Sequence, residues 1–260
     1  MNLDLSNKNA LVCGGSAGIG KASAMALAAM GARVTLAARN AEKLQAVVEQ
    51  LPNPELNHQY LVADFSDPTQ LKSAIMDAAS KQTFHILINN TGGPKGGPIY
   101  SADVSEFTKA FQQHLVCNQL LVQAVAPGMK ANSYGRIINI ISTSVKQPID
   151  GLGVSNTIRG AVASWSKTLA NELGCFGITV NNVLPGFTAT DRLADIVSGA
   201  AKRFDKTKEE AADFMKQLVP AKRFAQPEEI ANAVAFLASP AASYINGINL
   251  PVDGGRTKSL

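Results

Sequence analysis

The sequence predicts one α/β domain in which a parallel, doubly wound sheet of seven strands carries helices on both faces. The first observation is a series of short apolar runs that are nearly continuous instead of alternating, as in strands buried on both faces. The second is that longer segments of helical period separate these runs. The third is composition: the 260 residues are 46% hydrophobic and 17% charged, which supports a large core and excludes a disordered chain.

Each expected strand is rich in aliphatic side chains and is bounded by polar or glycine-containing segments. The seven runs are residues 10–13, 33–38, 60–63, 86–88, 136–141, 179–184 and 248–250. The expected helices run from the first glycine loop to residue 30, then over residues 41–51, 68–81, 104–131 and 156–173, with a final helix before the last strand. Residues 191–219 are polar, alanine-rich and helical in period, so we expect a substrate-covering insertion within a single domain of residues 1–260.

Composition and charge exclude several classes of function. The net charge is +4, but no basic stripe is interleaved with aromatic residues, so we expect no nucleic-acid partner. No apolar run reaches the roughly 18 residues of a membrane helix, and no secretory signal pattern is present, so we expect no membrane association. The three cysteines, Cys13, Cys117 and Cys175, are widely spaced, which predicts a cytoplasmic protein without a metal site.

A glycine-rich loop follows the first expected strand and opens the first expected helix. In the spacing GxxxGxG it contains Gly14, Gly15, Ser16, Gly18, Ile19 and Gly20. Because glycines carry no side chain, backbone N–H groups there can approach a pyrophosphate at a helix N-terminus. The loop therefore predicts a dinucleotide site, with a tight strand-to-helix turn as the alternative.

The residues after the second expected strand indicate which dinucleotide binds. An acid at this point would hold the ribose hydroxyls of NAD, but this chain has Arg39 and Asn40 there. A guanidinium suits a 2′-phosphate through charge-assisted hydrogen bonds, so we expect NADP(H). Asp64, after the third strand, is a candidate acceptor for the adenine amine or a turn residue.

Six motifs, in this order along the chain, resemble the short-chain dehydrogenase/reductase family. They are Gly14-xxx-Gly18-Ile-Gly20, Asp64, Asn89-Asn-Thr-Gly92, Asn139-Ile-Ile-Ser142, Asn182-Val-Leu-Pro185-Gly186, and the stretch from Arg223 to Gly255. The resemblance covers nearly the whole chain and is nearest to a divergent branch of 3-oxoacyl-ACP reductases. It implies a Rossmann-like fold and cofactor-binding roles for Asp64, Phe65, Asn90, Thr91, Gly92, Arg159, Pro185, Gly186 and Thr188.

The resemblance also implies the catalytic positions, and here the chain departs from the family. The family uses an Asn, a Ser and a Tyr-xxx-Lys pair. Ser142 matches the serine. In contrast, Ser155 and Arg159 stand at the tyrosine and lysine positions, and His114 stands at the asparagine position. One of the four catalytic positions is therefore unchanged.

Replacement of the family's tyrosine, lysine and asparagine changes how the site could supply a proton. Hydride transfer to a ketone needs a proton for the developing alkoxide, and serine is a shorter and weaker acid than tyrosine. We expect Ser142 to hold the carbonyl oxygen, Ser155 to assist through a water, and Arg159 to orient the ribose. His114 is a candidate replacement acid because imidazole titrates near neutrality; the alternative is a structural core histidine.

The sequence thus predicts an NADPH-dependent carbonyl reductase acting on small carbonyl compounds or acyl thioesters. An NADP(H)-binding sensor or structural subunit with decayed catalysis is the alternative, because the nucleotide residues remain while catalytic residues are replaced. A third hypothesis is dehalogenation, since halohydrin dehalogenases resemble the family and carry Arg at the Lys position; however, they retain the Tyr and lose the nucleotide loop. The segments 104–131, 156–173 and 244–255 resemble the family's interfaces and imply a homotetramer, with a dimer as the fallback.

Overall fold

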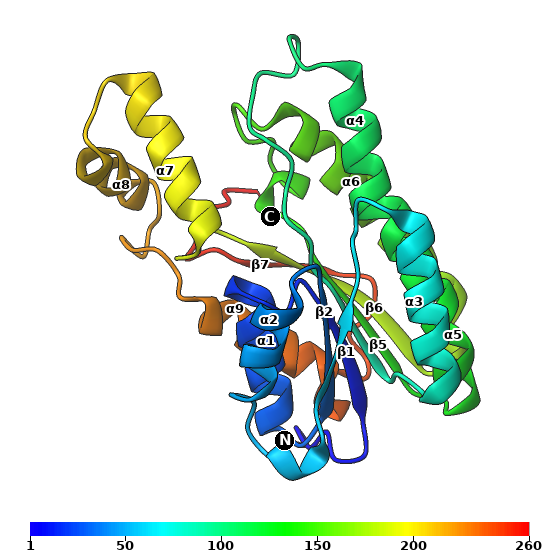
Figure 1. The fold of residues 1–260 in the computed structure, drawn as a ribbon. Helices are drawn as coiled ribbons and strands as arrows, with labels where there is room; N and C mark the ends of the chain where they lie inside the picture. Colours follow the sequence, from blue (N-terminus) through cyan, green and yellow to red (C-terminus); the bar gives the residue numbers. More distant parts are fainter. Residues whose placement is uncertain (260) are drawn as a thin grey trace.

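The computed structural model, described here for residues 1–259, contains one parallel seven-stranded sheet of order β3-β2-β1-β4-β5-β6-β7 (Figure 1). The strands are β1 (Asn9–Cys13), β2 (Arg33–Ala38), β3 (Gln59–Val62), β4 (Ile86–Asn89), β5 (Gly135–Ile140), β6 (Ile178–Pro185) and β7 (Asn249–Val252). Strands β2 and β3 extend the sheet on one side of β1, and β4 to β7 extend it on the other, so the order of the strands switches between β1 and β4. A ligand crevice is expected at that switch point. This architecture confirms the predicted fold class.

Helices cover both faces of the sheet. They are α1 (Gly18–Ala29), α2 (Ala41–Val48), α3 (Pro68–Lys81), α4 (Val104–Phe111), α5 (Cys117–Ala131), α6 (Gly153–Leu173), α7 (Asp191–Phe204), α8 (Lys208–Gln217) and α9 (Pro227–Ala238). Helices α1, α2 and α9 lie on one face, and α3, α5 and α6 lie on the other (Figure 1). Among residues 1–259, no helix has the length and apolar character needed to cross a membrane.

Strand β1 shows why nearly continuous apolar runs form this sheet. Ala10 and Val12 pack into the core beneath α1 and α9, whereas Leu11 and Cys13 pack into the core beneath α3 and α5. Successive side chains of a strand point to opposite faces, so a strand covered on both sides must be apolar at every position.

The predicted single helix over residues 104–131 is wrong in one respect. The structure divides it into α4, a π-helical turn at Gln112–Val116, and α5. The π turn inserts extra residues without ending the helix, so the apolar pattern continues through it. His114 lies inside this turn and is buried.

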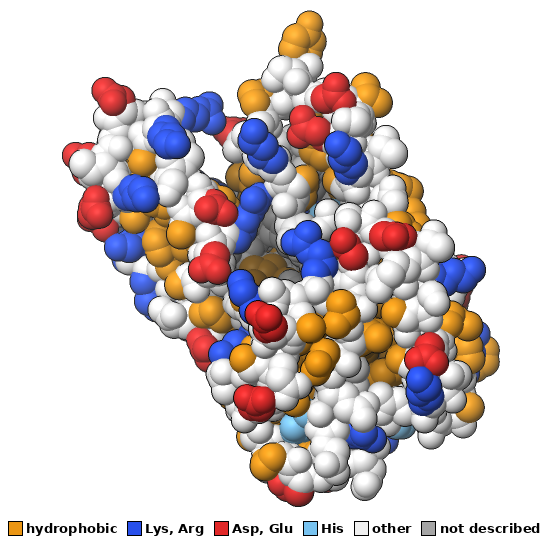
Figure 2. All heavy atoms as spheres, in the orientation of Figure 1, with side chains coloured by type: hydrophobic (Ala, Val, Ile, Leu, Met, Phe, Trp, Pro, Cys, Tyr) orange, Lys and Arg blue, Asp and Glu red, His pale blue; other side chains and the backbone are white. Residues whose placement is uncertain are grey.

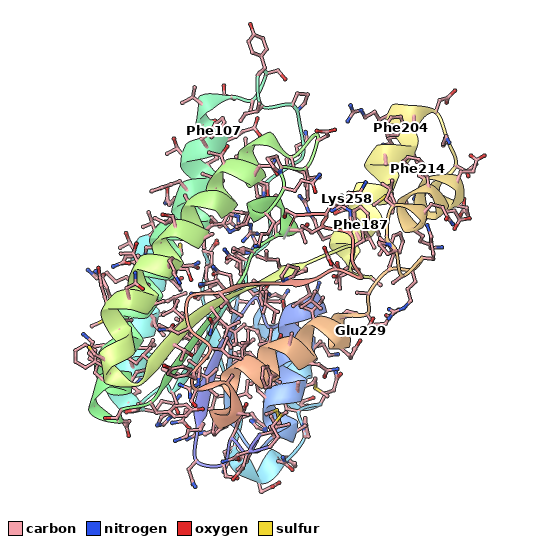
Figure 3. The ribbon with its side chains drawn as sticks, turned by 180° about the vertical axis from the view of Figure 1, so that it is seen from behind. Phe107, Phe187, Phe204, Phe214, Glu229 and Lys258 are labelled. Carbon is pink, nitrogen blue, oxygen red and sulfur yellow. The ribbon has the colours of Figure 1, made fainter. Side chains whose placement is uncertain are left out.

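The predicted insertion at residues 191–219 forms helices α7 and α8, which stand away from the sheet as an arm (Figure 3). The turn between the helices uses Asp205 in the left-handed conformation, with φ of 49°, and a capping box in which Thr207 and Glu210 bond each other's backbone starts α8. The two helices share a small apolar core made of Leu193, Val197, Ala201, Ala211 and Met215. The start of α7 reaches back over the carboxyl ends of the strands.

Candidate active site

A pocket of about 470 Å³ opens at the carboxyl ends of the central strands, beneath the start of α7. Its lining residues fall within residues 14–19, 90–93, 140–142, 152–159 and 185–196. Figure 2 shows the molecule hollowed beside α7, with blue Lys and Arg side chains along the hollow. This is the position at which open α/β sheets bind ligands, and the lining joins five segments that are distant in the sequence.

The glycine loop is folded so tightly that it cannot carry side chains. Gly14 has φ of 60°, and a Cβ there would stand 2.6 Å from the carbonyl oxygen of Asn90. A Cβ on Gly20 would stand 2.1 Å from the carbonyl oxygen of Gly14. The Asn90 amide donates to the Cys13 carbonyl at 3.3 Å and so ties the loop to the end of β4.

The first helix leaves its N-terminus open toward the pocket. Ala17, at the N-cap, offers no side-chain acceptor, and the first turn of α1 carries no acidic residue. The free N–H groups there attract an anion. Together with the glycine loop, this end of the pocket fits a pyrophosphate.

The four residues expected around the adenosine lie outside the pocket lining. Arg39 is exposed and, within residues 1–259, forms no ion pair. Asn40 caps α2 by accepting from the Lys43 N–H at 2.8 Å, and Phe65 is buried in the core. The pKa of Asp64 is lowered by hydrogen bonds from the backbone and hydroxyl of Ser66 and by the charge of Arg39.

The expected catalytic residues Ser142, Ser155 and Arg159 line the same pocket. Ser142 follows β5, and its Oγ accepts from the Ser144 N–H at 3.1 Å. A hydroxyl that accepts in this way still has its proton to donate, and here it can donate into the pocket. Ser155 lies in the first turn of α6 and is half-buried.

Arg159 is a buried charge for which residues 1–259 supply no counter-ion. It is 7% exposed, and its one hydrogen bond within residues 1–259 runs from Nη1 to the Ile140 carbonyl at 3.1 Å. Burial, and then the charge of Arg192, lower its pKa to about 10, so it stays protonated at neutral pH. In that part of the chain no carboxylate lies within ion-pair distance of it. An uncompensated charge is costly to bury, and an anionic or strongly polar ligand would offset the cost.

His114 does not line the pocket. It is 1% exposed, and its Nδ1 lies 2.6 Å from the hydroxyl of Thr91, which does line the pocket. Burial, and then the charge of Arg159, lower the pKa of His114 to about 2. The expected titration near neutrality is therefore corrected: the ring is neutral in the folded protein because the low-polarity surroundings disfavour its charged form.

Because His114 is held neutral, it should make the protein sensitive to acid. Between about pH 2 and 6.5 the unfolded chain binds a proton at this position and the folded chain does not. The free energy of unfolding should therefore fall below about pH 6.5, with a contribution of up to about 1.4 kcal/mol per pH unit. Urea unfolding at pH 7.5, 6 and 5 should show a shallower loss for His114→Asn. An equal loss in both proteins would contradict this assignment.

The segment from the end of β6 to the first turns of α7 adds lining residues that the sequence did not identify as site residues. Among them are Phe187, Thr190 and Arg192, and Thr190 packs over the glycine loop, with its methyl 3.1 Å from where a Cβ of Gly18 would stand. Pro185, Gly186 and Thr188, which were expected, also line the pocket. The sequence signal for Phe187 and Thr190 was their position shortly after the predicted strand end, and Arg192 falls in the predicted substrate-covering insertion.

Comparison with known proteins identifies relatives over the full length of the chain. The family model described as Enoyl-(Acyl carrier protein) reductase matches residues 14–257. The chain is 33% identical over 260 residues to the NADPH-dependent reductase BacG of Bacillus subtilis (strain 168). That alignment covers 98% of this chain and 100% of BacG. It is 33% identical over 255 residues to the 3-oxoacyl-[acyl-carrier-protein] reductase FabG of Rickettsia bellii (strain RML369-C), covering 97% of this chain and 98% of FabG.

Two solved structures share the fold closely. YwfH, an NADPH-dependent reductase involved in bacilysin biosynthesis, superposes with a TM-score of 0.92 at 31% identity and covers 98% of this chain and 100% of its own. The L-sorbose reductase of Gluconobacter frateurii, solved with NADPH and L-sorbose, also gives 0.92 at 29% identity and covers 100% of both chains.

Proposed function

Because this chain belongs to the short-chain dehydrogenase/reductase family, an oxidoreductase family, and uses NADP(H), we propose that it is an NADPH-dependent carbonyl reductase with altered catalytic residues. The observation that carries the proposal is the convergence of Ser142, Ser155 and Arg159 on the pocket that begins at the glycine loop. Small carbonyl compounds and acyl thioesters are the proposed substrates, as among relatives that include 3-oxoacyl-ACP and L-sorbose reductases.

The cofactor would lie along the carboxyl ends of the strands, and when bound it supplies the hydride. The glycine loop would hold its pyrophosphate, Arg39 its 2′-phosphate and Asp64 its adenine. The proposed contacts further along come from Asn90, Thr91, Gly92, Pro185, Gly186 and Thr188. Beside the substrate, the Ser142 hydroxyl donates to the carbonyl oxygen, and Arg159 orients the ribose and adds positive potential.

The proposed proton route uses water instead of a tyrosine. Ser155 is shorter than tyrosine, so its hydroxyl would orient a water that passes a proton from bulk solvent to the developing alkoxide, and the water is restored by that solvent proton. His114 enters as the neutral partner of Thr91, whose hydroxyl it fixes at the pocket wall. This geometry supports a positioning role for His114.

Titration with NADPH and NADH, followed by a turnover screen over ketones and acyl thioesters, tests the proposal. Tight NADPH binding with turnover supports the reductase. NADPH binding without turnover on any carbonyl would favour the alternative, an NADP(H) sensor or structural subunit. Failure to bind either nucleotide would overturn both.

Arg39→Asp should reverse the cofactor preference. The change removes a charge-assisted pair with the 2′-phosphate, worth about 1.5–3 kcal/mol, and places a carboxylate where NADH offers ribose hydroxyls. NADPH affinity should fall about 10- to 100-fold, and NADH should improve relative to it. Fluorescence titration measures both, and Lys202→Asp, an exposed change outside the pocket lining, is the charge-matched control. Equal or tighter binding of NADH by the unmodified protein would reject the role of Arg39.

We also propose a cytoplasmic homotetramer. The three cysteines are free, which suits a reducing compartment. Phe111 and Tyr244, in two of the segments expected at interfaces, expose their rings to solvent in the single chain. Sedimentation equilibrium at micromolar concentration tests the assembly, and a stable monomer would refute it.

A further inference from the structure

Two arginines from different helices reach the same point in the pocket. Nη2 of Arg159, from α6, and Nη2 of Arg192, from the first turn of α7, lie 3.8 and 3.7 Å from the position that a Cβ on Gly93 would take. Apart from Gly93 and its chain neighbours, no other heavy atom of residues 1–259 lies within 4 Å of that point. Two guanidinium groups therefore border the pocket of about 470 Å³ at the point where Gly93 also lines it.

Neither guanidinium has an anionic partner in the described part of the chain. The three ion pairs there are Lys81–Asp77, Lys216–Asp213 and Arg223–Glu229, all at exposed positions elsewhere. Even Asp191, which precedes Arg192 and also lines the pocket, pairs with neither arginine. Two like charges that approach each other at a partly buried site repel, and an anion bound between them would attract both and offset that repulsion.

Arg192 is held in position over the pocket. Its Nη2 donates to the Pro94 carbonyl at 2.6 Å, a bond between α7 and the loop after β4. A guanidinium has five N–H donors, so most donors of both arginines remain for a ligand. Arg159 can therefore bond a ribose hydroxyl and a second group together.

We propose that the pocket selects a carbonyl substrate that carries a carboxylate, an oxo acid, with Arg192 and Arg159 holding the carboxylate while Ser142 holds the carbonyl oxygen. The proposal rests on the reductase function argued above. A planar guanidinium matches the two oxygens of a carboxylate, which gives geometric specificity as well as charge. The cofactor's pyrophosphate is the other anion near this site, but the glycine loop and the open N-terminus of α1 already provide for it.

Matched pairs of acid and ester test the selectivity. The pairs are pyruvate with methyl pyruvate and acetoacetate with methyl acetoacetate, assayed by NADPH oxidation. The unmodified protein should prefer each acid by at least about 10-fold in kcat/KM. Arg192→Gln should lower kcat/KM for the acids about 10- to 100-fold, chiefly through KM, the range expected for a lost charge-assisted bond. Lys202→Gln, which removes a positive charge from α7 outside the pocket lining, should keep the acid preference.

Two further measurements separate this proposal from the reductase function and from the pyrophosphate. Calorimetry of the complex with NADP⁺ should show binding of oxamate but not of the uncharged oxamide, and Arg192→Gln should weaken oxamate binding about 10-fold or more. Oxamate binding without turnover of any carbonyl would support the anion site while the reductase function fails. Equal turnover of acids and esters, without oxamate binding, would overturn the anion site while the reductase function stands. Loss of NADPH affinity in Arg192→Gln with an unchanged acid preference would assign Arg192 to the pyrophosphate and also overturn the proposal.

Discussion

Gly20→Ala should abolish NADPH binding and destabilise the protein. The added methyl would stand 2.1 Å from the Gly14 carbonyl oxygen and 2.7 Å from Nδ2 of Asn90. The nearer atom belongs to the backbone, so no change of rotamer relieves the contact, and the loop must move away from the helix N-terminus. We expect NADPH affinity to fall at least about 100-fold and stability to fall by about 1–3 kcal/mol. Fluorescence titration and thermal denaturation measure the two effects.

Gly199→Ala is the matched control for this substitution. Gly199 lies inside α7, outside the pocket lining and the segments expected at interfaces, and a Cβ there meets no heavy atom of a neighbouring element within 4 Å. Alanine in a helix interior is favoured over glycine by roughly 0.5–1 kcal/mol, so the control should be slightly more stable and bind NADPH normally. If Gly20→Ala retained the affinity of the control, the glycine loop would not be the pyrophosphate cradle.

The sheet could be predicted from the sequence because its strands are buried on both faces. Such strands need apolar residues at every position, a local signal that Leu11 and Val12 already carry. The π turn at Gln112–Val116 left no such signal, because side chains on both sides of it continue to face the core. Helix α6 begins at Gly153, three residues before the start that we predicted, and this start was missed because glycine is a poor helix former and gives no helical signal. Gly153 stands there because a Cβ would lie 2.4 Å from Cβ of Ile99.

The candidate site also contains residues that the sequence could identify and residues that it could not. Ser142, Ser155 and Arg159 were found from motifs, since each keeps a fixed spacing to a strand end or helix that the sequence shows. Arg192 was not, because its approach to Gly93 depends on how the α7–α8 arm folds back over the pocket. The low pKa of His114 could not be predicted either. It results from burial of the ring in the folded protein, and the residue type alone does not indicate burial.

Ser142→Ala should reduce turnover far more than Ser155→Ala. The Ser142 hydroxyl accepts from the Ser144 N–H, so its own proton is available to the substrate oxygen in the transition state. Removal of one such donor typically costs about 100- to 1000-fold in kcat. Ser155 acts through a water, and in Ser155→Ala a second water can take the place of its hydroxyl, so we expect a loss of about 10-fold or less. Steady-state and single-turnover kinetics with NADPH would measure both.

Ser144→Ala is the control that separates the effect of Ser142→Ala on turnover from its effect on stability. Ser142 also caps the short helical turn at Thr143–Val145, so Ser142→Ala should cost about 1 kcal/mol of stability in addition to its effect on rate. Ser144→Ala keeps the capping N–H and removes a buried hydroxyl that has no partner within residues 1–259, so it should leave both stability and turnover nearly unchanged. A greater loss of kcat in Ser155→Ala than in Ser142→Ala would place the substrate oxygen against Ser155. Such a result would move the proton donor from water to the serine at the tyrosine position, because only direct contact lets so short a side chain control the rate.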